Sequence, residues 1–549
     1  MLLRSRPTGK KQFRCIATSV AQPSEADAVV EICRRLDGIP LAIELAASRM
    51  ASMTASEVRD RLDHRFRLLV GSRRGLPRHQ TLRHAVQWSY ELLTDAEKSL
   101  LTRCSVFAGG FDLQSACAVA GSDALDDYAI LDLLDALVRK SLIVADRSSG
   151  RTRFSMLETI RQFAAEQLVA SGGADEARAA HACYYAGREA DILALWDSPR
   201  QREAYDWFTV ELANLRTAFR WAADHGDLDV AAPIATYAGL LCVGVQTLEP
   251  IAWAEELIEP ARAVDHPRLA FLYVIAARCW MTGRIEAAVG YSEAGQIVLG
   301  RSREALPYGT EAWLGAVYLT IGQPERLAEL CRAQLARRRD TPVNIRAWLV
   351  AALSMAGSGG EAMDSADGLV EAAEATGNPF LFAWALAAYG AAFRDADPVG
   401  ALNAAGRGLV IAQDSGNRTI ASVLANVLAR LEAEQGGTVA AFDHLTLAIR
   451  NFHNAGDATT IRVPLAVLAA LFDRLGRYEP AATIAGFALS PLTATVPEFS
   501  AAITHLRDVL GDQTYESLAR KGETMTTAAM VTYAYDQIDQ ARTELEHPS

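Results

Sequence analysis

Apolar residues recur with a helical period along most of the chain. On the first predicted helix they are Ala26, Val29, Val30, Cys33 and Leu36. Residues 41–50 are apolar nearly all round, which predicts a buried helix. Thr54 and Glu57 have the spacing of a capping box, so we expect another helix to begin there with Val58 on its apolar face. Residues 71–77 indicate a linker.

A second group of elements is predicted between residues 78 and 170. Thr94 and Glu97 form another capping box before an apolar run, and a further helix is expected over residues 126–138. Two short strands are predicted at 141–144 and 153–156, on either side of a turn at 147–150. Helices followed by a small β-ribbon are typical of a winged helix.

From about residue 171 onward, turn signals recur at a fixed period. One series is Gly283, Gly322, Gly360, Asp397, Gly437 and Gly476, and the other is Gly300, Asp340, Gly377, Gly416 and Gly456. The steps are 37 to 40 residues in both series, which predicts two helices per unit. Such units build a TPR-like α-solenoid with a period longer than the usual ~34 residues, in which each hairpin is expected to contact mainly its neighbours.

Composition supports a mainly α fold. Half of the 549 residues are apolar and only 7% are aromatic, and the abundant alanine favours helices. No apolar run is long enough to span a bilayer and no leader peptide is evident, so we expect a cytoplasmic protein without membrane contact. The eight cysteines have no metal-ligand spacing, and no metal site is expected.

The net charge of −12 is unevenly distributed. Residues 1–110 hold 18 Lys and Arg against 11 Asp and Glu, whereas the remainder holds 36 against 55. The helix predicted at 126–138, which would be the recognition helix of a winged helix, carries four aspartates and no basic residue. Because an acidic helix is repelled by the phosphates that line a DNA groove, direct DNA binding is not expected.

The chain offers no recognisable catalytic machinery. The nearest approach to a phosphate-binding loop, residues 8–12, lacks the earlier glycine, the Ser or Thr after the lysine and a preceding apolar strand. No apolar strand ends in a metal-binding aspartate, and no Ser or Cys has a persuasive His and Asp constellation. We therefore expect neither ATP hydrolysis nor another enzymatic activity.

Gly38 and Pro40 form a helix–helix corner, since Gly can end one helix and Pro can open the next. The whole string from 31 to 47 resembles the Gly-x-Pro motif of NB-ARC/STAND signalling ATPases, in the version found in bacterial, actinobacterial-type regulators of the LuxR, AfsR and cyclase-coupled kind. Four later blocks, at 78–82, 88–90, 105–111 and 156–161, resemble the same regulators in the same order. The block at 211–216 resembles the start of their helical repeats.

The resemblance implies a domain order for the chain. Residues 1–24 are a basic, loose leader, 25–75 resemble the end of an NB-ARC ATPase module, a helical lid, and 76–170 form the winged helix. The TPR-like repeats occupy 171–525, and a C-terminal helix with an acidic tail occupies 526–549. In that family the proline lies against the adenine of a nucleotide, so Gly38 and Pro40, with His79 near a phosphate, are candidate remnant nucleotide contacts.

Without a phosphate-binding loop, any ADP or ATP binding at these residues is expected to be weak. The resemblance implies a regulatory, signal-transducing protein that corresponds to a truncated STAND-like transcriptional regulator. Its helical repeats are expected to sense a small-molecule inducer or a protein partner. Two alternatives remain open from the sequence: a plain TPR-like scaffold for protein interactions with no nucleotide role, and a transcription factor that binds DNA directly.

Overall fold

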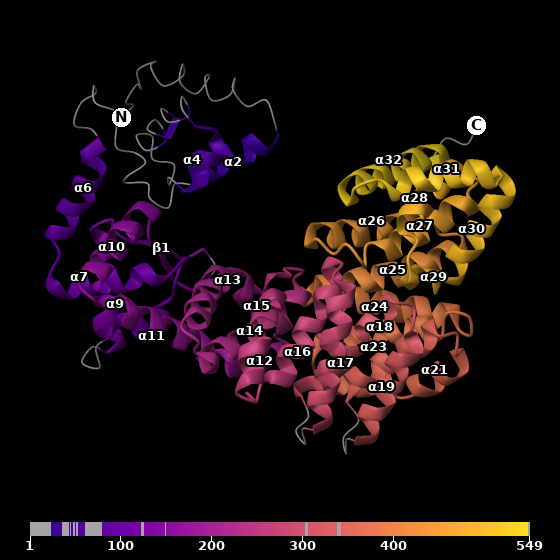
Figure 1. The fold of residues 1–549 in the computed structure, drawn as a ribbon, viewed down its shortest axis with the longest axis horizontal. Coiled ribbons are helices and arrows are strands. Elements are labelled where there is room, and N and C mark those ends of the chain that lie inside the picture. The colour runs from indigo at the N-terminus through magenta and orange to yellow at the C-terminus, as the bar shows by residue number, and fades with distance from the viewer. Residues whose placement is uncertain are drawn as a thin grey trace. The chain divides into compact units, whose positions relative to one another are not determined.

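The structure is a computed structural model of residues 1–549 (Figure 1). It describes residues 23–35, 43, 46, 47, 50, 53–60, 79–121, 126–148, 150–301, 306–337 and 342–546. The chain divides into two compact units, residues 1–184 and 185–549. Both units are built almost entirely from helices, and the two strands described both lie in the first unit.

The first unit begins with a small helical segment. Helices α2 (Pro23–Arg35) and α4 (Ala55–Asp60) pack together around buried Ala28, Ile32 and Val58. The capping box at α4 is present, since the Glu57 backbone N–H donates to Thr54 Oγ1 at 3.2 Å and the Thr54 N–H donates to Glu57 at 2.9 Å. The corner at Gly38 and Pro40 lies outside the described residues.

The winged helix follows in the same unit. Its elements are α6 (His79–Glu91), α7 (Asp95–Arg103), η2 (Cys104–Val106), α8 (Leu113–Ala120), α9 (Asp127–Arg139), β1 (Val144–Asp146), β2 (Arg153–Ser155) and α10 (Glu158–Ala170). The strands pair antiparallel, with Ala145 opposite Phe154. The predicted capping box of Thr94 and Glu97 starts α7.

The first strand begins later than the sequence predicts. Residues 141–144 were expected to be extended, but the strand occupies Val144–Asp146. Ser141 adopts a positive φ of 59°, and Leu142 and Ile143 are buried directly after α9 ends. The chain therefore turns inward before the ribbon starts, and the apolar pair fills the core instead of pairing in the sheet.

Helix α11 (Ala174–Gly187) begins after residue 170, where the winged helix was expected to end, but it packs against that domain. The His181 ring packs edge-on to Phe107, with ring centroids 5.0 Å apart. Glu176 forms an ion pair of 2.9 Å with Arg103. These contacts hold most of α11 in the first compact unit, which ends at Tyr184.

The second unit is an array of helical hairpins. Its helices are α12 (Glu189–Trp196), α13 (Gln201–Asp224), α14 (Leu228–Gly244), α15 (Glu249–Ala263), α16 (Leu269–Ala276), η3 (Ala277–Thr282), α17 (Ile285–Arg301), η4 (Pro307–Gly315), α18 (Ala316–Thr320), α19 (Pro324–Arg337), α20 (Val343–Met355), α21 (Gly359–Ala366), α22 (Leu369–Ala375), α23 (Pro379–Ala392), α24 (Pro398–Asp414), α25 (Arg418–Gln435), α26 (Thr438–Ala455), α27 (Arg462–Arg474) and α28 (Tyr478–Ala488). Consecutive helices pack against one another, as in TPR-like repeats.

Most predicted turn positions end or begin a helix. Gly283, Gly322, Gly377, Gly416, Gly456 and Gly476 all have positive φ in turns between helices. Asp340 lies outside the described residues, and two of the described positions differ. Gly300 lies inside the last turn of α17, and Gly360 lies inside α21, where the turn falls at Gly357 with φ of 75°. The period is therefore real, although single turns shift by a few residues.

Each hairpin packs mainly on its neighbours, as expected, but several hydrogen bonds also join hairpins that are far apart in sequence. Asn378 caps α23 and its side-chain amide also donates to Asp197 at 2.9 Å. Asn417 caps α25 and donates to the Tyr205 hydroxyl at 3.0 Å. The array curves until hairpins far apart in sequence meet, and capping residues of later hairpins are bonded to its first helices.

Two further hydrogen bonds join the same distant parts of the array. Thr419 Oγ1 donates to the Val243 carbonyl at the end of α14. Thr459 Oγ1 donates to the Trp280 carbonyl in η3 at 2.6 Å. We call this set of contacts the cross-array links.

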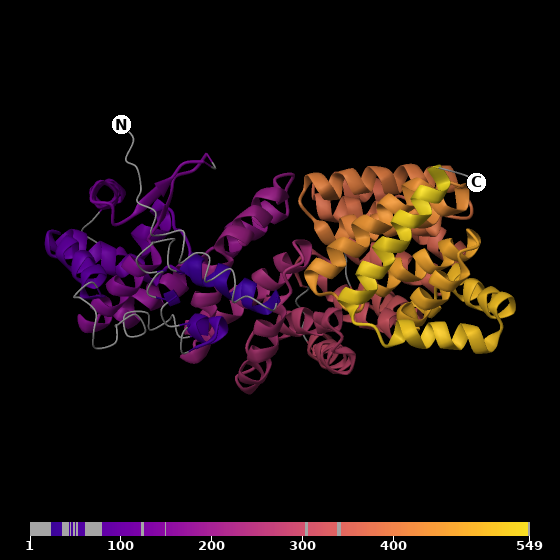
Figure 2. The same cartoon turned by 90° about the horizontal axis from the view of Figure 1, so that it is seen from above.

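After α28 the array ends in α29 (Pro491–Ala494), α30 (Pro497–Leu510), α31 (Asp512–Glu523) and α32 (Thr527–Glu546). Helix α31 packs on α28, and α32 lies on α26, where Figure 2 shows it in yellow across the neighbouring helices. The contact of α28 with α31 depends on Gly486 and Gly522. A Cβ at Gly486 would lie 2.0 Å from the Ala519 carbonyl oxygen, and one at Gly522 would lie 1.8 Å from that of Thr483.

Candidate functional site

The nucleotide contacts expected from the sequence are not among the described side chains. Gly38 and Pro40 lie outside the described residues, and His79 opens α6 with only its backbone described. These three residues remain a prediction.

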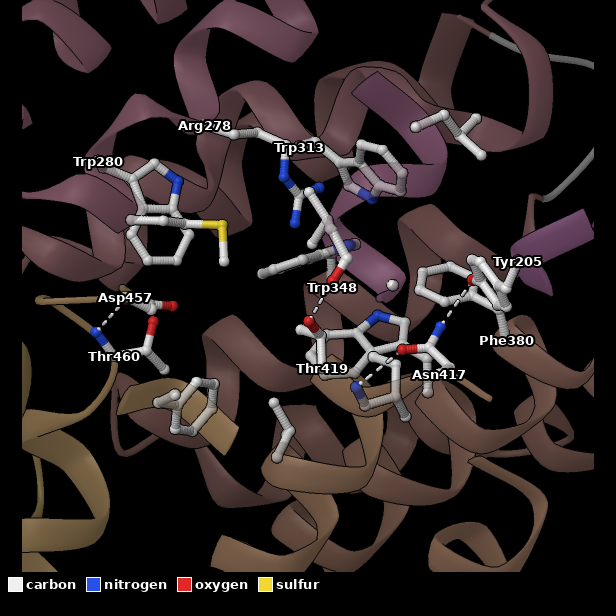
Figure 3. A pocket seen from close by; sticks show the side chains of 18 of the residues that line it. Tyr205, Arg278, Trp280, Trp313, Trp348, Phe380, Asn417, Thr419, Asp457 and Thr460 are labelled. Atoms are coloured by element: carbon white, nitrogen blue, oxygen red, sulfur yellow. Dashed lines mark hydrogen bonds between the residues drawn. The ribbon is translucent and has the colours of Figure 1, made fainter. Parts of the chain in front are cut away.

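A cavity of about 100 Å³ lies inside the helical array of the second unit (Figure 3). Five tryptophans from different helices line it: Trp196, Trp280, Trp313, Trp348 and Trp384. Residues on the first helices of the array and residues near the cross-array links, such as Asn417, Thr419 and Thr460, complete its walls. The curvature that forms the links therefore also forms the cavity.

The aromatic rings of the wall are in contact with one another. Trp348 and Trp384 have ring centroids 4.8 Å apart. Phe380 lies between two further tryptophans, 5.5 Å from Trp196 and 6.2 Å from Trp313. Such ring pairs form a rigid apolar surface that packs well against another planar group.

Most of the indole N–H groups in the wall have no acceptor. Trp196 donates to the Tyr205 hydroxyl at 3.1 Å. The Nε1 atoms of Trp280, Trp313, Trp348 and Trp384 are buried, and no described residue accepts from them. Buried donors without partners are uncommon in proteins and carry a free-energy cost. The wall therefore holds an excess of hydrogen-bond donors.

Arg278 brings a positive charge to this apolar cavity. Its side chain comes from η3 and is only 7% exposed, and Figure 3 shows the guanidinium pointing into the space between the labelled tryptophans. The guanidinium lies 4.4 Å from the ring centroid of Trp313, a cation–π contact. Its Nε has no hydrogen-bond partner, and no carboxylate of the described part of the chain forms an ion pair with it.

Burial lowers the pKa of Arg278 to about 10, because the charged form loses hydration. At neutral pH the guanidinium therefore keeps its charge. A buried charge without an ion-pair partner destabilises the protein unless another group compensates it.

Asp457 is the second ionisable group of the cavity and follows the end of α26. Its Oδ1 accepts the backbone N–H groups of Thr459 at 3.2 Å and Thr460 at 2.8 Å. Its Oδ2 is buried without a partner among the described residues. Burial raises the pKa of Asp457 to about 6, mainly because the carboxylate is removed from water.

Sequence reasoning missed this site, although a signal was present. Trp280, Trp313, Trp348 and Trp384 follow one another at steps of 33, 35 and 36 residues, close to the repeat period. Large residues that recur once per hairpin lie on the same side of an array, which would have indicated a shared aromatic surface. No comparable pattern singles out Arg278 or Asp457.

The exposed side of α9 in the winged helix is acidic and partly apolar. Asp127, Asp132 and Asp135 are exposed, together with Tyr128 at 79% and Leu131 at 41%. The two basic residues at its end are paired, Lys140 with Glu97 at 2.6 Å and Arg139 with Asp135. This surface therefore offers little positive charge to a nucleic acid.

The described residues include no candidate membrane span and no candidate metal site. No helix there is long and apolar enough to cross a membrane. No group of three or more His, Cys, Asp or Glu side chains in the described ranges is placed to hold a metal ion.

Comparison with known protein families matches residues 93–169 to a winged helix-turn-helix domain. The match covers α7 to α10 and the β-ribbon, and so confirms the winged helix expected from the sequence.

Curated relatives occur in mycobacteria. A protein of Mycobacterium tuberculosis named "Putative HTH-type transcriptional regulator" is 44% identical over 255 residues, which are 46% of this chain and 28% of the relative. A protein of the same name in Mycobacterium bovis gives the same values. A protein of M. tuberculosis named only as uncharacterized is 46% identical over 149 residues, 27% of this chain and 38% of that protein.

Two solved structures are similar at a low level. One is a STAND protein with a tetratricopeptide repeat sensor from Pyrococcus horikoshii, with 15% identity, a TM-score of 0.41 and coverage of 91% of this chain and 74% of the other. The second is a Rap protein in complex with the Competence and Sporulation Factor, with 13% identity, a TM-score of 0.38 and coverage of 66% and 99%. At these TM-scores the similarity carries no argument. This chain spans little more than a quarter of the length of its mycobacterial regulator relatives.

Proposed function

We propose that the chain is a regulatory module, in which the helical array senses a small-molecule ligand and the winged helix makes protein contacts that pass on the signal. The observation that carries this proposal is the aromatic cavity of the array, with its buried Arg278 and its unpartnered donors. Groups left without partners in a cavity are costly to a protein that has no use for them. Relatives named as transcriptional regulators agree with a regulatory role.

The geometry favours a small molecule over a peptide. Open helical arrays offer a long concave surface to extended partners. Here the cross-array links close that surface, for example between Asn417 and Tyr205, and leave a cavity of about 100 Å³. An extended peptide has no room there, although the outer helices could still bind a protein.

The winged helix is proposed to bind protein instead of DNA. The acidic, partly apolar face of α9 suits a protein surface and repels phosphates. An electrophoretic shift of duplex DNA by the full chain tests this point. We expect no shift at 50 mM salt beyond that of an equally acidic control protein, and a shift that weakens steeply with salt would favour the DNA-binding alternative.

We also propose that the chain is not an enzyme. By itself it does not pass through a cycle of ATP binding and hydrolysis. The sequence has no phosphate-binding loop. Purified protein should release phosphate from ATP at the rate of a blank. Turnover that disappears when a residue of this chain is mutated would contradict this proposal.

The main test is a thermal-shift screen of the full chain against small metabolites, including sugars, amino acids, aromatic acids, ADP and ATP. A ligand that binds the folded state raises the melting temperature in proportion to the logarithm of its concentration. We expect at least one chemical class to do so.

A cavity-filling variant locates the site. Val423 lines the cavity, so Val423→Phe should abolish the shift while circular dichroism stays helical. Val410→Phe, on an exposed position of α24, is the matched control and should keep the shift. If no compound stabilises the wild type, or if Val423→Phe responds like the wild type, the array is not a small-molecule sensor and the scaffold alternative is favoured.

A further inference from the structure

The buried charge in the cavity limits which ligands can bind there. The Arg278 guanidinium keeps its positive charge at neutral pH and has no ion-pair partner among the described residues. A ligand that brings a carboxylate would supply that partner, since guanidinium and carboxylate bind in a bidentate, charge-assisted geometry. The unpartnered indole N–H groups nearby are also donors, so the wall favours acceptor groups over donors.

The rest of the cavity limits the size and shape of the ligand. At about 100 Å³ the cavity is smaller than the engineered apolar cavity of about 150 Å³ that binds benzene, so it excludes anything larger than a single ring, and even one ring requires the walls to yield. The walls are aromatic rings in contact, such as Trp348 and Trp384 at 4.8 Å, which stack well on a planar group.

A cationic ligand fits less well, although aromatic cages commonly bind cations. The cation–π position over Trp313 is already taken by Arg278 at 4.4 Å. A second cation would be repelled by that guanidinium at short range in a medium of low dielectric.

Asp457 compensates Arg278 only in part. It lines the same cavity and its charge stabilises the guanidinium from a distance, but no ion pair joins the two groups, and its Oδ1 is held by the backbone N–H groups of Thr459 and Thr460. Its unpartnered Oδ2 can accept from a donor group on the far side of a ligand.

We propose that this cavity binds a monocyclic aromatic carboxylate, with the carboxylate on Arg278 and the ring against the tryptophans. The inference rests on the proposed sensing function of the array and names the chemical class of its ligand.

Benzoate, benzamide and benzamidinium are the probes, because they carry a negative, a neutral and a positive planar group of nearly equal size on the same ring. Titration of the full wild-type chain is followed by calorimetry and by tryptophan fluorescence, since five of its nine tryptophans line the cavity. We expect benzoate to bind at least tenfold more tightly than benzamide, and the cation to bind no better than benzamide.

Substitutions at Arg278 test whether its guanidinium selects the negatively charged probe. Arg278→Gln should weaken benzoate binding at least tenfold and leave benzamide within threefold, while Arg278→Lys should keep part of the preference for the anion. Arg326→Gln is the matched control, because Arg326 also lies over an aromatic ring, Tyr318 at 4.1 Å, but does not line the cavity. It should bind all three probes as the wild type does.

Each other outcome contradicts the inference. Equal binding of benzoate and benzamide, tighter binding of the cation, or no binding of benzoate at 10 mM would overturn it, and the wild-type comparison decides this even if Arg278→Gln does not fold. One outcome separates the two proposals. If a class of compounds stabilises the wild type but not Val423→Phe, and benzoate is not preferred over benzamide, the array is still a small-molecule sensor and only the aromatic carboxylate is rejected as its ligand.

Discussion

At the scale of single residues, Arg278 is a buried cation that the array compensates only in part, through the charge of Asp457 in the same cavity. Substitution of an arginine that only stabilises the fold would lower the free energy of unfolding. For Arg278 we expect no loss or a gain, because burial disfavours its charged form and lowers its pKa. Replacing a whole buried ion pair with apolar residues is neutral or stabilising in many proteins, and we expect the same of this single buried cation, which forms no ion pair with a described residue.

Arg278→Met should therefore unfold at a urea concentration equal to or higher than that of the wild type, with a gain of up to about 3 kcal/mol. Circular dichroism in urea is the measurement. Arg462→Met is a useful comparison, because Arg462 lies over the Phe487 ring at 5.0 Å but also donates to main-chain carbonyls, so its loss should destabilise. A destabilised Arg278→Met would indicate that Arg278 is a structural residue.

Asp457 gives a pH-dependent prediction. Its pKa is raised from 3.8 to about 6, so the folded state holds a proton that the unfolded state has released between these two values. The stability contributed by this group therefore falls as the pH rises from about 4 to about 6. Above pH 6 the folded state carries the cost of a buried carboxylate.

Asp457→Asn keeps an oxygen for the N–H groups of Thr459 and Thr460 and removes this cost. We expect the variant to be more stable than the wild type at pH 7.5, by roughly 1–3 kcal/mol, and the gain to be about a third as large at pH 4.5. Urea denaturation at both pH values measures the difference. The same gain at both pH values would show that Asp457 does not titrate with a raised pKa.

At the scale of elements, the contact of α28 with α31 depends on the absence of a side chain. A Cβ at position 486 would lie 2.0 Å from the Ala519 carbonyl oxygen, which belongs to the backbone of the other helix and cannot rotate away. Gly486→Ala should therefore lower the midpoint of urea denaturation, at a cost of about 3 kcal/mol or more.

The matched control is Gly406→Ala in α24, where a Cβ would meet nothing within 4 Å. Because alanine favours a helix over glycine, this change should stabilise by about 0.5–1 kcal/mol. Two substitutions of the same type are thus expected to have opposite signs. If both stabilise, α28 and α31 are further apart than described.

The elements themselves were largely readable from the sequence, because local chemistry determines them. Thr94 and Glu97 form their capping box within four residues, and Gly283 and Gly476 take the positive φ expected of helix ends. The first strand of the ribbon was misplaced, since the burial of Leu142 and Ile143 depends on the rest of the winged helix.

The candidate site was much less predictable. The recurrence of tryptophan near the repeat period could have suggested an aromatic surface, but the cavity exists only because the array curves. Curvature results from small rotations summed over several hairpins, which no local pattern encodes. Arg278 and Asp457 are 179 residues apart in sequence, and nothing in the chain indicates that both reach one cavity.

At the scale of the whole array, the cross-array links predict a departure from ordinary solenoid behaviour. In an open array each unit contacts only its neighbours, so removal of one unit leaves the others intact. Deletion of residues 343–378, the hairpin of α20 to α22, would remove Asn378 with its link to Asp197 and would displace Asn417 from its partner Tyr205. We expect a product that melts without cooperativity or aggregates, measured by circular dichroism and size-exclusion chromatography.

A deletion product that is monomeric and melts as cooperatively as the wild type would contradict the closed array. Thr459→Val is a milder comparison, because it removes only one link, the hydrogen bond to the Trp280 carbonyl. It should keep a single cooperative transition at a slightly lower temperature.

The cross-array links also bear on how such a protein can evolve. Repeat arrays commonly gain or lose units by duplication and loss of gene segments, and an open array tolerates a change in length. Here the capping asparagines of two hairpins must meet the first helices at a fixed place, much as the last segment of a ring must meet the first. The number of hairpins between them is therefore set by geometry, and relatives that keep the cavity should keep that number even where their sequences have diverged.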